Sequence, residues 1–148
     1  MPATYVLVVR YADHVPLYRQ SVIYAGVELE RALLACCVGA ASALLRLLAE
    51  AWRRYVFAAA KLQANDTPLP VPAPGNGKTR AARIWSYVRD DRTSGASKRP
   101  DVRFAYSPDR KGDHPQAHLV HFTGVLHTDA YAGFNAIYDS GRVVEAVC

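Results

Sequence analysis

Cysteine is scarce in this chain, which has three such residues, Cys36, Cys37 and Cys148. Adjacent cysteines seldom pair with each other and an odd number leaves one thiol over, so the sequence predicts no disulfide framework. No Cys-x-x-Cys pair is present, which excludes the commonest thiolate zinc site. This cysteine usage favours a reducing, cytoplasmic location.

The sequence also lacks an uncharged apolar run long enough to predict a membrane span. The longest one, residues 32–45, is shorter than the roughly 20 residues that a spanning helix needs, and it favours a core helix. The N-terminal segment carries Arg10 and Asp13 where a secretion signal would need apolar residues and a small-residue cleavage site. We therefore predict no secretion signal and no membrane partner.

Positive charge and apolar residues are both plentiful. The 148 residues carry a formal net charge of +5, and 51% of them are hydrophobic while 21% are charged. This composition predicts a folded core, either of one domain or of a small domain with an appendage. A basic balance favours nucleic acid as a partner, although many basic proteins bind no polyanion.

Residues 1–59 are predicted to form a helical N-terminal region. The pattern indicates a helix over 17–24, a turn at Gly26 and a long helix over 28–57, with Gly39 as a candidate break. The segment "YVLVV" near the N-terminus fits a short strand or a helix equally well. A short helix, a glycine turn and a longer helix also outline a helix-turn-helix, which is common in purely structural helix pairs.

Residues 60–148 are predicted to form an α/β unit. Short links between the first three strands suggest an antiparallel meander, and the intervening helices suggest that the last two strands are parallel. This is the order of a ribonuclease H-like mixed sheet. The expected strands cover 61–71, 83–90, 102–107, 123–131 and 143–148, with a loop over 72–82 and helices within 109–122 and 132–141.

The glycine-rich segment "PGNGKT" does not match a phosphate-binding P-loop. The position of the first motif glycine holds Pro72, and the segment joins two expected strands rather than a strand and a helix. Two interpretations remain, namely a basic hairpin tip, or a DNA-backbone contact made by Lys78, Arg80 and Arg83.

Four histidines lie in the second half of the chain, at His114, His118, His121 and His127. The spacing of four between the first two places them on one helical face, as in some zinc sites. No cysteine lies near them, so surface or helix-capping roles are favoured over zinc.

Asp129 follows an apolar strand, and two readings of it stay open. In one, Asp129 and an acid from the first strand converge on Mg²⁺ ions for phosphoryl chemistry. In the other, Asp129 caps the helix that follows, as aspartate often does.

Five collinear segments resemble the central domain of the transposases of insertion sequence family 66. They are "YADHVPLYRQSVIY", "NDTPLPVPAPGNGKT", "WSYVRDDR", "FAYSPDRKGDHPQAHL" and "GVLHTDAYAGFNAIY". The resemblance implies a bacterial DDE transposase with a ribonuclease H-like fold, a metal-bound Asp-Asp-Glu triad, Mg²⁺ as cofactor, and element ends and target DNA as partners.

The resemblance assigns the family's second aspartate to Asp129 and its first to the position of Asn65. Asparagine offers a carbonyl oxygen but no charge, so hard cations are held less strongly there. The neighbouring Asp66 could substitute as catalytic or metal-binding acid only through a local bulge, because adjacent residues of a strand point to opposite faces. The candidate metal ligands are thus Asn65, Asp66 and Asp129.

The candidate DNA contacts are basic residues of the second half of the chain. They are Lys78, Arg80, Arg83, Arg89, Arg110 and Lys111.

The family's catalytic glutamate is expected on a helix beyond the fifth strand, and this chain ends at Cys148. The resemblance therefore predicts a truncated transposase fragment whose ancestral role is DNA transposition by phosphodiester cleavage and strand transfer, and which is itself inactive. The alternatives are a non-catalytic DNA-binding protein, a fragment that joins full-length transposase and inhibits it, and a product that barely folds.

Overall fold

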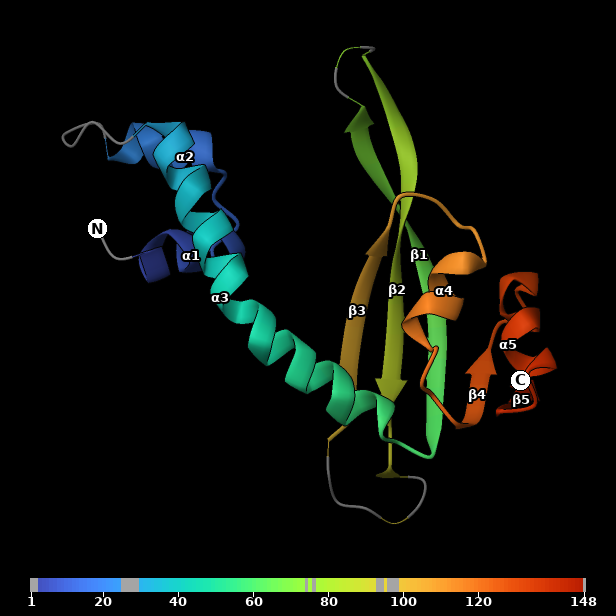
Figure 1. Cartoon of the computed structure of the whole chain (residues 1–148). Helices are drawn as coiled ribbons and strands as arrows, with labels where there is room; N and C mark the ends of the chain where they lie inside the picture. The colour runs from blue at the N-terminus through green and yellow to red at the C-terminus, as the bar shows by residue number, and fades with distance from the viewer. Residues whose placement is uncertain are drawn as a thin grey trace. The chain divides into compact units, whose positions relative to one another are not determined.

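The computed structural model describes residues 3–24, 30–73, 75, 77–92, 95 and 99–147. The chain divides into two compact units, Met1–Glu50 and Ala51–Cys148 (Figure 1). The turn expected at Gly26 lies outside the described residues. The predicted domain boundary between residues 59 and 60 stays a prediction.

The N-terminal unit is helical. It contains α1 (Ala3–Tyr11), α2 (Leu17–Ile23) and the first part of α3 (Arg31–Phe57). The ambiguous segment near the N-terminus is therefore helix. The buried Gln20 amide donates hydrogen bonds to the carbonyls of Val15 (3.1 Å) and Val6 (3.4 Å), which ties α2 to α1.

Helix α3 continues through Gly39 without a break. One glycine costs a helix only about 1 kcal/mol relative to alanine, and the surrounding alanines and leucines are strong helix formers.

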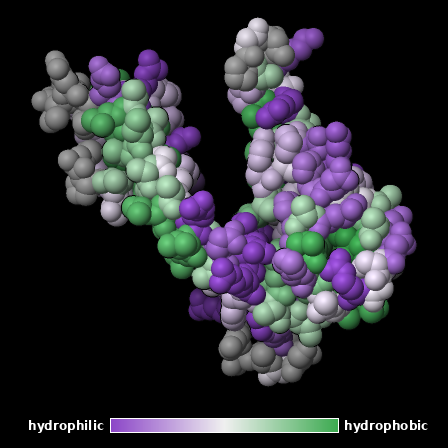
Figure 2. Space-filling model, in the orientation of Figure 1, coloured by the Kyte–Doolittle hydropathy of each residue, from purple (hydrophilic) through white to green (hydrophobic). Residues whose placement is uncertain are grey.

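The apolar middle of α3 is largely exposed, contrary to the prediction of a core helix. Leu44, Leu47 and Leu48 are 80%, 78% and 65% exposed. Because α3 extends past residue 45 to Phe57, it is long and apolar enough to cross a membrane by length and composition, and 11% of its apolar window is buried. Core helices of soluble proteins can have the same length and apolar composition. Figure 2 shows hydrophobic surface over this unit.

The second unit is built on a five-stranded mixed sheet in the order β3-β2-β1-β4-β5. The first three strands pair antiparallel, while β4 is parallel to β1 and β5 is parallel to β4. This arrangement confirms the α/β class and is that of a partial ribonuclease H-like fold. The strands are β1 (Lys61–Ala73), β2 (Lys78–Arg89), β3 (Asp101–Ser107), β4 (Gly124–Thr128) and β5 (Val143–Val147).

Three short helices supply side chains that cover one face of the sheet. They are α4 (Asp113–His118), the 3₁₀ helix η2 (Ala132–Phe134) and α5 (Asn135–Asp139). Strand β2, which includes most of the strand expected over 83–90, alternates in burial, since Trp85 and Tyr87 are fully buried on this face and Ser86 between them is not. Apolar burial against this face is the main stabilising term of the unit. The other core residues include Leu62, Leu119, Phe122, Leu126, Phe134 and Ile137.

The loop expected over 72–82 is instead mostly strand, and this part of the prediction is wrong. β1 and β2 stay paired as far as Ala73 and Lys78, so they form a two-stranded ribbon that extends beyond the other strands (Figure 1). The prolines at 68, 70 and 72 are tolerated because every second N–H of β1 points away from β2. On that side β4 pairs only with Lys61–Gln63.

A buried polar pair lies within the core of the second unit. The Tyr87 hydroxyl and His118 Nδ1 are 2.9 Å apart, and both side chains are packed edge to face. Burial, together with nearby positive charge, lowers the pKa of His118 from 6.5 to about 4. Burial also raises the pKa of Tyr87. The pair is therefore neutral at neutral pH.

We predict that the free energy of unfolding falls as the pH is lowered from 6.5 towards 4. In this window the unfolded chain protonates His118 and the folded chain does not, so protons favour unfolding. Urea unfolding followed by circular dichroism at pH 7 and pH 5 measures the decrease. The variant His118→Asn should reduce this pH dependence, while His121→Asn, at an exposed position, should keep it. Equal pH dependence in all three proteins would contradict the assignment.

Candidate functional site

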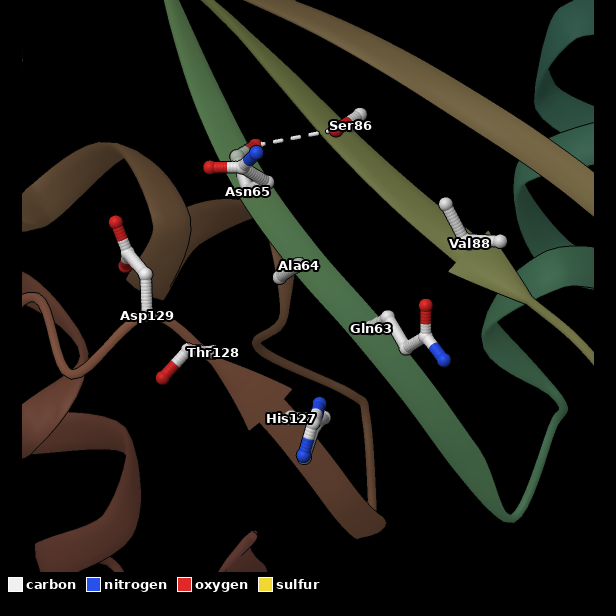
Figure 3. A pocket seen from close by; sticks show the side chains of 8 residues that line it. All are labelled: Gln63, Ala64, Asn65, Ser86, Val88, His127, Thr128 and Asp129. Carbon is white, nitrogen blue, oxygen red and sulfur yellow. Dashed lines mark hydrogen bonds between the residues drawn. The ribbon is translucent and has the colours of Figure 1, made fainter. Parts of the chain in front are cut away.

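The parallel pairing of β1 with β4 brings Asn65 and Asp129 together. The last residue pair between these strands is Gln63 with His127. Asn65 and Asp129 each follow two residues later, so the same register sets them opposite each other. Paired residues of neighbouring strands face the same side of a sheet, and Figure 3 shows both side chains at one open space.

An open cleft of about 430 Å³ lies at this position. Its lining mixes apolar and polar groups and carries little charge, with amide, hydroxyl and imidazole groups around a single carboxylate (Figure 3). The lining residues are Gln63, Ala64, Asn65, Ser86, Val88, His127, Thr128 and Asp129.

Asp129 lines the cleft and also bonds the turn that follows it. Its Oδ1 accepts a hydrogen bond from the Tyr131 N–H at 3.3 Å, and its side chain is 50% exposed. The intervening Ala130 has a positive φ of 60°. Asp129 therefore bonds the turn before η2 and does not cap that helix, whose N-cap residue is Tyr131 and makes no side-chain cap hydrogen bond. One carboxylate oxygen bonds the backbone while the carboxylate faces the cleft.

Asn65 is held within the β1–β2 pair. Its Oδ1 accepts a hydrogen bond from the Asp66 N–H at 2.8 Å, and its carbonyl accepts one from Ser86 Oγ at 3.3 Å. The amide oxygen that a cation would approach is therefore already bonded to the backbone.

Asp66 does not line the cleft. The β1–β2 register runs from Gln63 to Ala73 without an extra residue, so no bulge turns Asp66 towards Asp129. Its carboxylate is 2% exposed and lies 3.1 Å from Arg83 Nη1 and 2.8 Å from Arg110 Nη2. Asp66 is paired with arginines on the face opposite to that of Asn65.

The side chains at the cleft do not fit a two-metal site. Asp129 offers one carboxylate, while Asn65 offers a neutral amide whose oxygen is already bonded. Mg²⁺ in nucleotide-processing sites is held by carboxylates, which supply the charge that an amide lacks. Within the described ranges, no three His, Cys, Asp or Glu side chains form a group that could hold a metal.

The four histidines considered as zinc ligands lie in different environments. His114 Nε2 lies 2.7 Å from Asp109 Oδ1, and His118 is in the core with Tyr87. His121 is exposed, and His127 lines the cleft.

The predicted DNA contacts do not form one patch. Lys78 and Arg80 lie on the ribbon, where Arg80 Nη2 is 3.5 Å from the Tyr106 hydroxyl. Arg89 lies at the other end of β2, bonded to Asp91 at 2.7 Å.

Two further predicted contacts meet at Asp66, which binds both Arg83 and Arg110. The remaining one, Lys111, is 73% exposed, and its Nζ lies 3.8 Å from Asp109 Oδ2.

Sequence reasoning missed three polar residues of the cleft, namely Gln63, Ser86 and Thr128, and one aromatic residue near Asp129. Gln63 could have been found because it lies two residues before Asn65 on the same face of β1. Ser86 joins them only through the β1–β2 register. The aromatic residue is Tyr131, whose ring lies under the Arg110 guanidinium at 4.1 Å.

Comparison with known proteins identifies the family to which this chain is similar. The sequence profile described as "Transposase IS66 family" matches residues 3–148. The protein y4qI of Sinorhizobium fredii (strain NBRC 101917 / NGR234), which is described as uncharacterized, is 39% identical over 132 residues. That match covers 88% of this chain and 24% of the relative.

Two further uncharacterized proteins of the same strain are similar. The protein y4hP is 39% identical over 130 residues, which are 86% of this chain and 23% of the relative. The protein y4jD is 28% identical over 137 residues, which are 91% of this chain and 27% of the relative. No solved structure matches the chain significantly.

The chain thus spans about a quarter of the length of these relatives. The family match extends over both compact units and includes Asn65, Asp66 and Asp129. The chain belongs to the IS66 family of transposases.

Proposed function

We propose that this chain binds DNA as a transposase-derived core in the cytoplasm, without cutting it. The observation that carries the proposal is that Asn65 and Asp129 line one cleft, each two residues beyond the last pair between the parallel strands β1 and β4. In the family a divalent cation such as Mg²⁺ activates the attacking oxygen for phosphodiester cleavage and strand transfer. Here the position opposite Asp129 holds an amide, so we assign no cleavage step to this copy.

The ribbon supports the DNA-binding part of the proposal. Between Asp66 and Asp90 the sequence has no acidic residue. The basic side chains of Lys78 and Arg80 therefore belong to a stretch of the chain that adds positive charge without local acids. A basic ribbon of this kind is suited to contact phosphates along a duplex.

Full-length transposase is a second proposed partner, which we infer from α3. The side chains of Leu44 and Leu47 are 80% and 78% exposed. Clustered exposed leucines favour contact with another apolar surface.

We predict that the wild-type chain does not nick supercoiled plasmid in Mg²⁺ or Mn²⁺. We also predict that Asn65→Asp tightens Mn²⁺ binding about tenfold, because a second carboxylate then faces Asp129. Isothermal titration calorimetry measures the binding. The combined variant Asn65→Asp with Asp129→Asn is the control and should bind as weakly as wild type. Wild-type nicking that disappears with Asp129→Ala would contradict the proposal.

For the ribbon, we predict that changing Lys78 and Arg80 together to glutamine weakens binding to a short DNA duplex. The slope of log Kd against log salt should fall by about 2, because two basic side chains no longer bind phosphates. Fluorescence anisotropy over a salt series gives both quantities. The control changes Arg19 and Arg46, which are exposed in the N-terminal unit, to glutamine. If both double variants behave alike, net charge rather than the ribbon explains the binding.

For α3, we predict that the tagged chain co-purifies with full-length IS66 transposase. The double variant Leu44→Glu with Leu47→Glu should abolish this co-purification. The control is Val144→Glu, which adds a charge at a 62% exposed position of β5. Association that survives the α3 change would place the contact elsewhere.

A further inference from the structure

Asp66 is fully engaged by two guanidinium groups. Its Oδ1 accepts hydrogen bonds from Arg110 Nη2 at 2.8 Å and Nε at 3.1 Å, and its Oδ2 accepts from the same Nε at 3.1 Å. Arg83 Nη1 lies 3.1 Å from Oδ2. With its carboxylate 2% exposed, Asp66 has no open oxygen for an outside ligand.

These bonds fix the position of Arg110, which comes from the connection between β3 and α4. The Arg110 guanidinium lies over the Tyr131 ring, 4.1 Å from its centroid. The Tyr131 hydroxyl donates to the Arg110 carbonyl, so the same tyrosine holds both the backbone and the side chain. The hydrogen bond to Asp66 also raises the pKa of Arg110, which stays protonated.

One edge of the Arg110 guanidinium is left open beside the cleft. Its Nη2 lies 3.8 Å from Asp129 Oδ2, and the side chain is 40% exposed. The bonds to Asp66 use Nε and Nη2, and no hydrogen bond joins Nη1 to any residue that the structure describes. The charges of Arg83 and Arg110 balance those of Asp66 and Asp129, so what Arg110 offers to a further ligand is the hydrogen-bonding capacity of Nη1.

We propose that Asp66 is a positioning residue that holds Arg110 as a contact for a DNA phosphate beside Asp129. The inference rests on the DNA binding proposed above and names the residues that make the contact. A guanidinium held by a bidentate carboxylate keeps a fixed plane, and its free amino group then offers a charge-assisted hydrogen bond to a phosphate oxygen. Asp66 acts through Arg110 and touches neither metal nor DNA.

The test is the variant Asp66→Asn, measured by anisotropy with a short DNA duplex. General electrostatics predicts tighter binding when a negative charge is removed, whereas we expect binding about tenfold weaker because Arg110 loses its charged partner. Asp139→Asn, which removes the same charge at an exposed position, is the matched control and should bind as well as wild type or better.

A second variant keeps the test decisive if Asp66→Asn fails to fold. Arg110→Ala should weaken binding and lower the slope of log Kd against log salt by about 1, the value for one phosphate contact. If Arg110 had only a structural role, Arg110→Ala would lower the unfolding temperature and leave that slope unchanged. Arg19→Ala is the control for the removal of one positive charge.

The outcomes separate the two proposals. A wild-type chain that does not bind DNA would overturn the proposed function. Wild-type binding with an unchanged slope in folded Arg110→Ala, or with unchanged or tighter affinity in folded Asp66→Asn, would overturn only the role of Asp66 and Arg110.

Discussion

The parallel pairing of β1 with β4 is the constraint on which the site depends. Three residue pairs fix the register, and the two strands then carry Asn65 and Asp129 forward to one open cleft. A shift by one residue would place Asp66 there instead and would turn every side chain of β1 to the other face. The buried side chains of Leu62 and Leu126 prevent this shift, because both must stay on the helix-covered face. The apolar core therefore decides which polar residue meets Asp129.

The same alternation separates two kinds of electrostatic environment by one residue. Asn65 faces a cleft with a single carboxylate, whereas Asp66 faces two arginines beneath the helices. A carboxylate buried without partners would cost several kcal/mol, so the arginine pair is what allows an acid at this position. Arg110 connects the two environments, since it binds Asp66 and also approaches Asp129.

The ribbon of β1 and β2 and the helix α3 both expose long stretches to solvent, but with different kinds of side chain. The ribbon of β1 and β2 leaves the sheet as a basic, proline-containing hairpin, and α3 presents leucines without cover among the described residues. A free strand edge is protected from further pairing by prolines, which lack the N–H that a new strand would need. Exposed leucines have no such protection, which is why α3 favours association.

The sequence by itself determined much of the second unit and little of its site. The period-two pattern of residues 83–90 was enough to predict the core of strand β2, because side chains of a strand alternate between its two faces. It did not tell which face is buried. Local patterns could not show that the ribbon continues past residue 71, since prolines and glycines usually indicate loops. Nor could they show that α3 is exposed, because an apolar helix looks the same whether it is covered or not.

The partners of Asp66 were decided only by the tertiary structure. Arg110 lies 44 residues away in the sequence, on the connection between β3 and α4, and reaches Asp66 only through the tertiary packing of that connection. Sequence reasoning placed Asn65 and Asp66 on opposite faces, which follows from strand geometry alone. What fills the space on each face depends on contacts between distant segments, and no local pattern encodes them.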